Sequence, residues 1–77
     1  MNMNNVSQQV YDILKSELSE ATARSILAIR CKAAGKNPDA LTSNDVKDIE
    51  PKILAGVLLF GGEDKAKAIK EKLRKLH

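Results

Sequence analysis

The ten residues PKILAGVLLF, at positions 51–60, constrain the fold more than any other stretch of this chain. Lys52 is the only polar side chain among them. Proline is favoured at the first position of a helix, and it disfavours helical geometry in the residue before it, so Pro51 predicts a helix start. A helix that is apolar on nearly every side belongs at the buried centre of a bundle. The sequence therefore predicts a helix over 51–60 with three buried side chains, Leu54, Val57 and Leu58.

Two helices are predicted earlier in the chain. Apolar residues recur at helical spacing over 5–18, where Asn4 or Asn5 can cap the first turn. Ser19 can cap a second helix that ends just before Gly35, because serine suits the N-cap and glycine suits a left-handed helix exit. The next six residues, GKNPDA, are typical of a turn.

A short third helix is predicted over 43–49. Thr42 stands at the N-cap position and Asp45 follows three residues later, which is a shortened capping box. Leu41 and Val46 occupy the two positions of the hydrophobic staple that often accompanies such a box. These signals fix the start of the helix, and the proline at position 51 is expected to end it.

A last helix is predicted over 63–76. Its apolar residues follow a 3-4-3 spacing that forms one narrow seam, namely Ala66, Ile69, Leu73 and Leu76. Two acidic residues lie at its start and basic residues and His77 at its end, which complements the helix dipole. Gly61 is expected to end the preceding helix with a left-handed conformation.

The composition indicates that these helices form one small domain. The chain has 77 residues, of which 43% are hydrophobic and only 3% aromatic, so its core must be aliphatic. Residues that favour helices outnumber those that favour strands. The expected fold is therefore all-α, a compact orthogonal bundle of four to five short helices in a single domain spanning residues 1–77.

Few side chains are suited to catalysis or metal binding. Cys31 is the only cysteine and His77 the only histidine, at the last position, where a helix frays. A paired nucleophile and base, or a zinc site, is therefore not expected. We expect a protein that is not an enzyme and needs no cofactor. An unpaired cysteine and the lack of a secretory signal or a membrane-length apolar run favour the cytoplasm.

Gly61 and Gly62 allow two interpretations. Gly62, Ala66 and Ile69 stand at the offsets of the second half of the helix-hairpin-helix motif, so this stretch resembles that motif of nucleic-acid-binding proteins. The resemblance implies that backbone N–H groups at the hairpin hold a phosphate. However, Phe60 replaces the motif's first glycine, and two acidic residues follow the second. The sequence therefore favours a structural hinge over a phosphate-binding loop.

Two residues are candidates for contacting a partner protein. Arg30 projects into the apolar side of the second helix, where it could pair with Asp45, Asp48 or Glu50, cap carbonyls of a neighbouring helix, or be presented to another protein. The internal role is favoured. Tyr11 is expected to be exposed beside the apolar stripe of the first helix.

Charge suggests the functional alternatives. Residues 1–62 have no net charge, and the whole excess of +3 lies in residues 63–77. The leading hypothesis is a small protein-interaction or regulatory module that binds a protein partner or a second copy of itself, and no membrane. The alternative is a nucleic-acid-binding module whose last helix contacts phosphates through six cations, Lys65, Lys67, Lys70, Lys72, Arg74 and Lys75.

Overall fold

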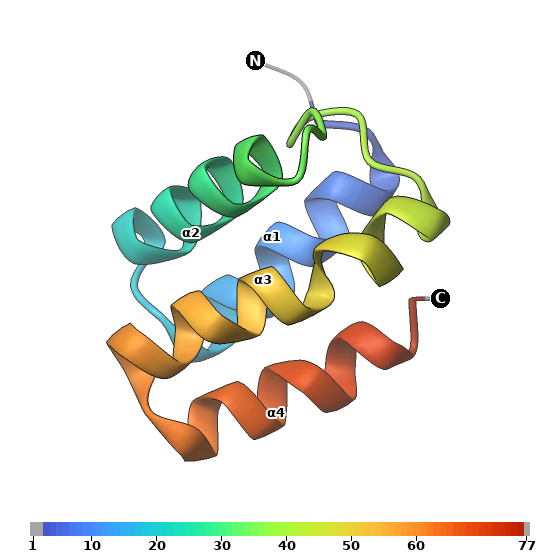
Figure 1. The fold of residues 1–77 in the computed structure, drawn as a ribbon. Coiled ribbons are helices and arrows are strands. Elements are labelled where there is room, and N and C mark those ends of the chain that lie inside the picture. Colours follow the sequence, from blue (N-terminus) through green and yellow to red (C-terminus); the bar gives the residue numbers. More distant parts are fainter. Residues whose placement is uncertain (1–2, 77) are drawn as a thin grey trace.

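The computed structural model describes residues 3–76, which form four α-helices and, within that range, no strand (Figure 1). The helices are α1 (Asn5–Glu17), α2 (Glu20–Ala33), α3 (Ser43–Gly61) and α4 (Glu63–Arg74). The prediction of an all-α bundle is confirmed, with four helices. His77, expected to support the end of the last helix, lies outside the described residues.

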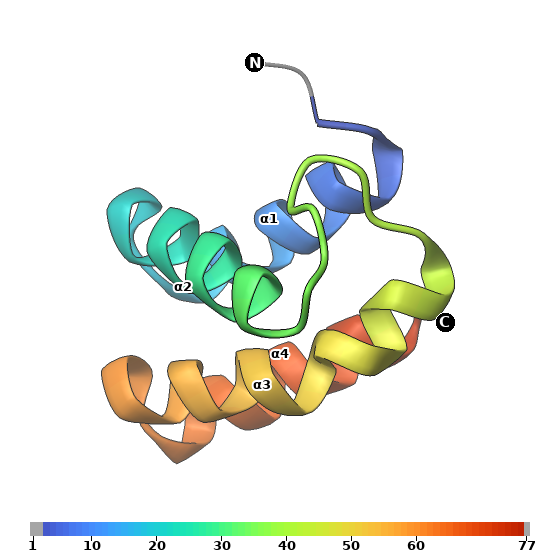
Figure 2. The ribbon, with the colours of Figure 1, turned by 45° about the horizontal axis from the view of Figure 1, so that its top comes forward.

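The helices pack as a closed ring around one core. α3 packs against α2 on one side and α4 on the other, while α1 contacts both α2 and α4 and closes the ring. In Figure 1, α2, α3 and α4 run alongside one another with alternating chain direction, and α1 lies behind them. Figure 2 shows the 34–42 connection crossing from the end of α2, past the start of α1, to the start of α3.

Each helix contributes aliphatic residues to the core. Pairs of fully buried side chains come from every helix: Val10 and Leu14, Leu27 and Cys31, Ile49 and Ile53, and Ile69 and Leu73. Those on α4 belong to the seam predicted from its 3-4-3 spacing. Burying one aliphatic side chain of this size contributes about 1.5–3 kcal/mol to the stability of the fold. The buried pairs of the four helices together therefore hold the bundle closed.

The predicted helix caps are present. The Asn4 side chain accepts a hydrogen bond from the Ser7 amide of α1 at 2.9 Å, and Ser19 caps α2 in the same way. Asn4 also donates from Nδ2 to the Leu41 carbonyl at 2.9 Å, and the buried Ser7 hydroxyl accepts from the Leu41 amide at 2.9 Å. The start of α1 therefore holds the connection that leads into α3.

Pro51 does not end a helix, contrary to the sequence prediction. The predicted helices 43–49 and 51–60 are one continuous helix, α3, with Pro51 inside it. A proline in a helix interior removes one backbone hydrogen bond and costs about 3 kcal/mol. Val46 and Ile49 before the proline and Ile53 after it are all fully buried on one face. Their combined burial offsets the cost of the proline, so the helix continues.

The left-handed glycine is Gly62, and the prediction that Gly61 takes this role is wrong. Gly61 is the last residue of α3 and is helical, whereas Gly62 has φ 84° and ψ 179°. Only glycine adopts this region readily. Gly62 is both the C-cap of α3 and the N-cap of α4, so one residue makes the whole reversal between two antiparallel helices.

No helix in the described part of the chain combines the length and the apolar character that crossing a membrane requires.

Candidate protein-binding surface

Large apolar side chains are exposed at the C-terminal end of α3. Leu58, Leu59 and Phe60 are exposed to 52%, 76% and 69%, and Ile29 on α2 is exposed to 62%. We call these four residues the apolar patch. The prediction that Leu58 is buried is therefore wrong, and Leu54 is only half-buried, whereas Val57 is fully buried as expected.

The position of α3 explains this exposure. Its buried face is formed by Val46, Ile49, Ile53, Gly56 and Val57, which point toward α2, α4 and the core. A helix with neighbours on two sides keeps its third side open to solvent. Three consecutive residues span more than half a helical turn, so positions 58–60 cannot all face the core.

A shallow groove lies next to the patch. Phe60 lines it together with Ala21, Thr22 and Ser25 from the first turns of α2, and its volume is about 180 Å³. Ile29 follows Ser25 by one helical turn. The groove therefore extends the apolar patch from α3 across to the exposed side of α2.

Arg30 of α2 lies against α3 at Gly56, one helical turn before Phe60. Its Nε atom is 2.9 Å, and its Nη2 atom 3.5 Å, from the point where a Cβ on Gly56 would be. Gly56 thus provides the space that the guanidinium occupies, which explains a glycine in the middle of a buried helix face. Within residues 3–76 we find no ion pair and no side-chain hydrogen bond of Arg30, and the side chain is half-buried.

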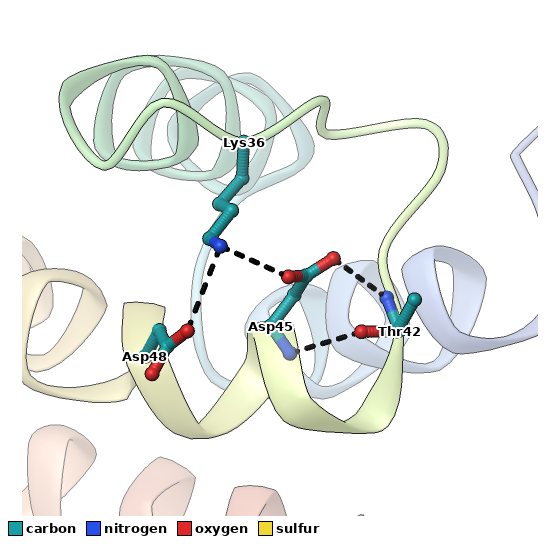
Figure 3. Close-up of polar contacts among 4 residues, drawn as sticks. All are labelled: Lys36, Thr42, Asp45 and Asp48. Atoms are coloured by element: carbon teal, nitrogen blue, oxygen red, sulfur yellow. Dashed lines mark hydrogen bonds and ion pairs between the residues drawn. The ribbon is translucent and has the colours of Figure 1, made fainter.

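Two of the carboxylates considered as partners of Arg30 are paired with another residue. Lys36 lies in the connection before α3 and reaches Asp45 at 3.2 Å and Asp48 at 3.6 Å (Figure 3). Asp45 also completes the capping box, because it accepts from the Thr42 amide at 3.0 Å while Thr42 accepts from the Asp45 amide at 3.1 Å. The Thr42 amide and then Lys36 lower the pKa of Asp45, and Asp45 in turn raises the pKa of Lys36.

Tyr11 is buried, so the expectation that it is exposed is wrong. Only 6% of the residue is accessible. The Arg24 guanidinium lies 5.5 Å and the Lys15 ammonium 5.8 Å from the centre of its ring, which places two cations over the aromatic face. The ring belongs to the hydrophobic core, and one of the two cations over it comes from α1 and the other from α2.

Of the six cations proposed to contact phosphates, one is engaged by another helix and two share a groove with carboxylates. Lys72 is bound to α1, because its Nζ lies 3.2 Å from Glu17 and 2.8 Å from the Ser16 hydroxyl. Lys67 and Lys70 line a groove of about 560 Å³ between α3 and α4 that also contains Glu63 and Asp64. All of the six except Lys72, which is half-buried, are exposed, namely Lys65, Lys67, Lys70, Arg74 and Lys75.

Cys31 is a core residue. Its side chain is fully buried, and burial together with the nearby Asp45 raises the pKa of the thiol to about 11. At neutral pH the thiol is therefore protonated, which makes it a poor nucleophile. The interpretation of Cys31 as a small packed residue is confirmed.

Comparison with known proteins provides no relative: no protein-family model, curated protein or solved structure matches this chain significantly. Its function must be inferred from its own residues. Sequence reasoning missed the apolar patch and the role of Lys36. The run of apolar residues up to Phe60 was the available signal for the patch, since a short bundle cannot cover every side of one helix. Nothing in the sequence pattern indicates the partners of Lys36, which lies outside any helix.

Proposed function

We propose that this protein is a non-enzymatic helical binding module that docks another polypeptide on the apolar patch. The observation that carries this proposal is the exposure of Leu58, Leu59 and Phe60 in one continuous stretch of α3. Large contiguous apolar surface is costly in water and marks sites where proteins meet. Each such side chain contributes about 1.5–3 kcal/mol when it is transferred from water into an interface.

The surroundings of the patch favour a polypeptide over other ligands. The groove beside Phe60, at about 180 Å³, is smaller than the roughly 300–1,000 Å³ of typical small-molecule sites. Arg30 lies against Gly56, one helical turn before Phe60, and exposed charged residues of both signs follow the patch in the sequence at the start of α4, so charged side chains surround an apolar centre as in a protein interface. The unpaired Cys31 supports a reducing compartment such as the cytoplasm.

Nucleic-acid binding through α4 has weaker support. Lys72 is engaged with Glu17, and two carboxylates share the groove that Lys67 and Lys70 line. Carboxylates at the start of α4 occupy the positive end of the helix, where the helix-hairpin-helix resemblance would place a phosphate. These contacts support the hinge interpretation of the glycine pair.

Site-specific photocrosslinking tests the proposal. A photoreactive benzoylphenylalanine replaces Phe60 in one variant and Asn44, an exposed residue at the other end of α3, in a matched control. In the cells that produce the protein, we expect a discrete polypeptide adduct at position 60 and none at position 44. Excess wild-type protein added to a cell extract should suppress the adduct, whereas the Leu59→Glu variant should not. Equal labelling at both positions, or no adduct at position 60, would contradict the proposal.

A further inference from the structure

We infer that the polypeptide that docks on the apolar patch is an acidic amphipathic segment, which packs apolar side chains on Phe60 and Ile29 and binds the Arg30 guanidinium through an aspartate or glutamate carboxylate. This inference rests on the proposed function and names the chemistry of the partner. It follows from a cation that the fold presents, without a carboxylate of its own, on the surface that continues from the patch.

This surface is a strip along the line where α2 and α3 run side by side in opposite directions (Figure 1). At one end, Phe60 lines a groove with the first turns of α2, and Ile29 is exposed farther along that helix. Arg30 lies against Gly56, one helical turn before Phe60. Lys52 is exposed and precedes Gly56 by one more turn. The strip therefore changes from apolar to basic over about 12 Å of α3.

The positive charge of the strip is not balanced by its surroundings. One helical turn to each side of Arg30 on α2, and of Gly56 on α3, the sequence contains no aspartate or glutamate. The next carboxylate along this side of α3 is Asp48, which lies 3.6 Å from Lys36. Within residues 3–76, Arg30 has neither an ion pair nor a side-chain hydrogen bond. Its capacity to bind an anionic group is therefore unused.

A half-buried guanidinium is well suited to bind a carboxylate. Its planar fork of N–H donors matches the two carboxylate oxygens, and such charge-assisted hydrogen bonds are about twice as strong as neutral ones. Partial burial strengthens the attraction further, because less water screens the two charges.

The apolar half of the strip favours a polypeptide as the source of that carboxylate. Three of the four side chains of the apolar patch are aliphatic, namely Ile29, Leu58 and Leu59. Aliphatic side chains of a peptide can be buried against them, whereas nucleic-acid bases stack on aromatic rings. A basic segment would be repelled by Arg30 and Lys52.

The geometry also predicts the sequence pattern of the partner. Gly56 and Phe60 are about 6 Å apart along α3, which corresponds to about one turn of a docked helix or two residues of an extended segment. The partner should therefore carry an aspartate or glutamate roughly two to four positions from a large apolar residue.

Selection from a random-peptide library tests the inference. The purified full chain is the bait, and phage-displayed peptides of about 16 residues, or four helical turns, are the probe. On the wild type we expect enrichment of aspartate or glutamate at this spacing from leucine, isoleucine or phenylalanine. On Arg30→Glu the acidic residue should be replaced by lysine or arginine. A lack of acidic enrichment on the wild type, or the same enrichment on both baits, would overturn the inference.

Fluorescence anisotropy with the most enriched peptide measures the contact itself. Arg30→Met keeps most of the side-chain volume and removes the charge, so it should weaken binding at least about tenfold. Lys47→Met, at an exposed position near the start of α3, is the matched control and should leave the dissociation constant unchanged. Replacing the peptide's acidic residue by its amide should weaken binding to the wild type but not to Arg30→Met. An equal loss with both proteins would show that the carboxylate binds elsewhere. Circular dichroism of each variant verifies that the helices are intact.

The Leu59→Glu variant separates this inference from the proposed function. Peptides that this variant no longer binds, but that require no carboxylate, overturn the inference and leave the proposed function standing. The lack of any such patch-dependent peptide overturns the inference, and the lack of an adduct at position 60 as well overturns the proposed function. A wild-type dimer in analytical ultracentrifugation that Leu59→Glu dissociates would identify a second copy as the occupant and overturn the inference. An Arg30-dependent complex with single-stranded DNA that is tighter than the peptide complex would also overturn it.

Discussion

The side chain of Arg30 lies directly on Gly56, with its Nε atom 2.9 Å from the position that a Cβ atom on this glycine would take. Glycine inside a helix costs about 1 kcal/mol relative to alanine. Here the glycine leaves room for the arginine, because any larger residue would have to displace that side chain.

This relationship predicts an energetic coupling between the two positions. Gly56→Ala should bring little or no stabilisation in the wild type, since the gain in helix propensity is offset by displacement of Arg30. In the Arg30→Ala background the same change should stabilise the protein by about 0.5–1 kcal/mol. Urea unfolding of the four proteins at low concentration measures the coupling. An equal effect in both backgrounds would show that Arg30 does not constrain position 56.

Removing the N-cap of α3 should weaken the whole fold. Thr42→Ala deletes the hydroxyl that accepts from the Asp45 amide at 3.1 Å, and loss of such a cap costs about 1 kcal/mol. Ser43→Ala, an adjacent exposed position, is the control and should change the free energy of unfolding by less than about 0.5 kcal/mol. Equal costs for the two substitutions in urea unfolding would mean that the capping box contributes nothing specific.

Acid should remove the contribution of Asp45 to the stability of the folded protein. The Thr42 amide and Lys36 hold the pKa of this carboxyl below its usual value. A group whose pKa is lower in the folded state stabilises the protein fully above its unfolded pKa, near 3.9, and loses that contribution as the pH falls through the folded value. The stability advantage of wild type over Asp45→Asn should therefore be constant above about pH 5 and shrink below about pH 4. Unfolding in urea across this pH range tests it, and an advantage that persists undiminished at pH 2 would contradict it.

The two neighbouring glycines should respond differently to alanine. Gly62 has φ 84°, so Gly62→Ala forces a strained backbone that costs about 1–3 kcal/mol. The atoms nearest to a Cβ on the helical Gly61 are the ends of two movable side chains, Leu18 Cδ2 and Lys65 Cδ at 3.0 Å, followed by Lys65 Cβ at 3.2 Å. Gly61→Ala should therefore cost less than Gly62→Ala in the same thermal or urea unfolding experiment. The reverse order would place the reversal between α3 and α4 at Gly61.

Nucleic acid should bind weakly and without specificity. We expect wild-type protein to show no complex with DNA or RNA tighter than the roughly 10⁻⁴–10⁻⁶ M of non-specific binding at physiological salt. Fluorescence anisotropy across a salt series measures this. A sub-micromolar complex that weakens steeply with salt and is lost in Gly62→Val would instead support a phosphate-binding loop at the glycine pair.

The sequence alone determined the fold class and most helix boundaries. The Asn4, Ser19 and Thr42 caps and the left-handed Gly35 are local features, because each depends on hydrogen bonds or backbone angles within about four residues. The apolar seam of α4 was predicted for the same reason, since its 3-4-3 spacing is visible without any neighbour.

Only the tertiary structure decided the features that depend on what lies next to each helix. Pro51 remains inside α3 because burial on both sides of it outweighs one lost hydrogen bond. Tyr11 is buried because α2 and its Arg24 cover the ring. Leu58, Leu59 and Phe60 are exposed because no other helix covers that side of α3. Periodicity indicates which residues share a face, but burial is set by the helices that pack on that face, and these come from distant parts of the chain.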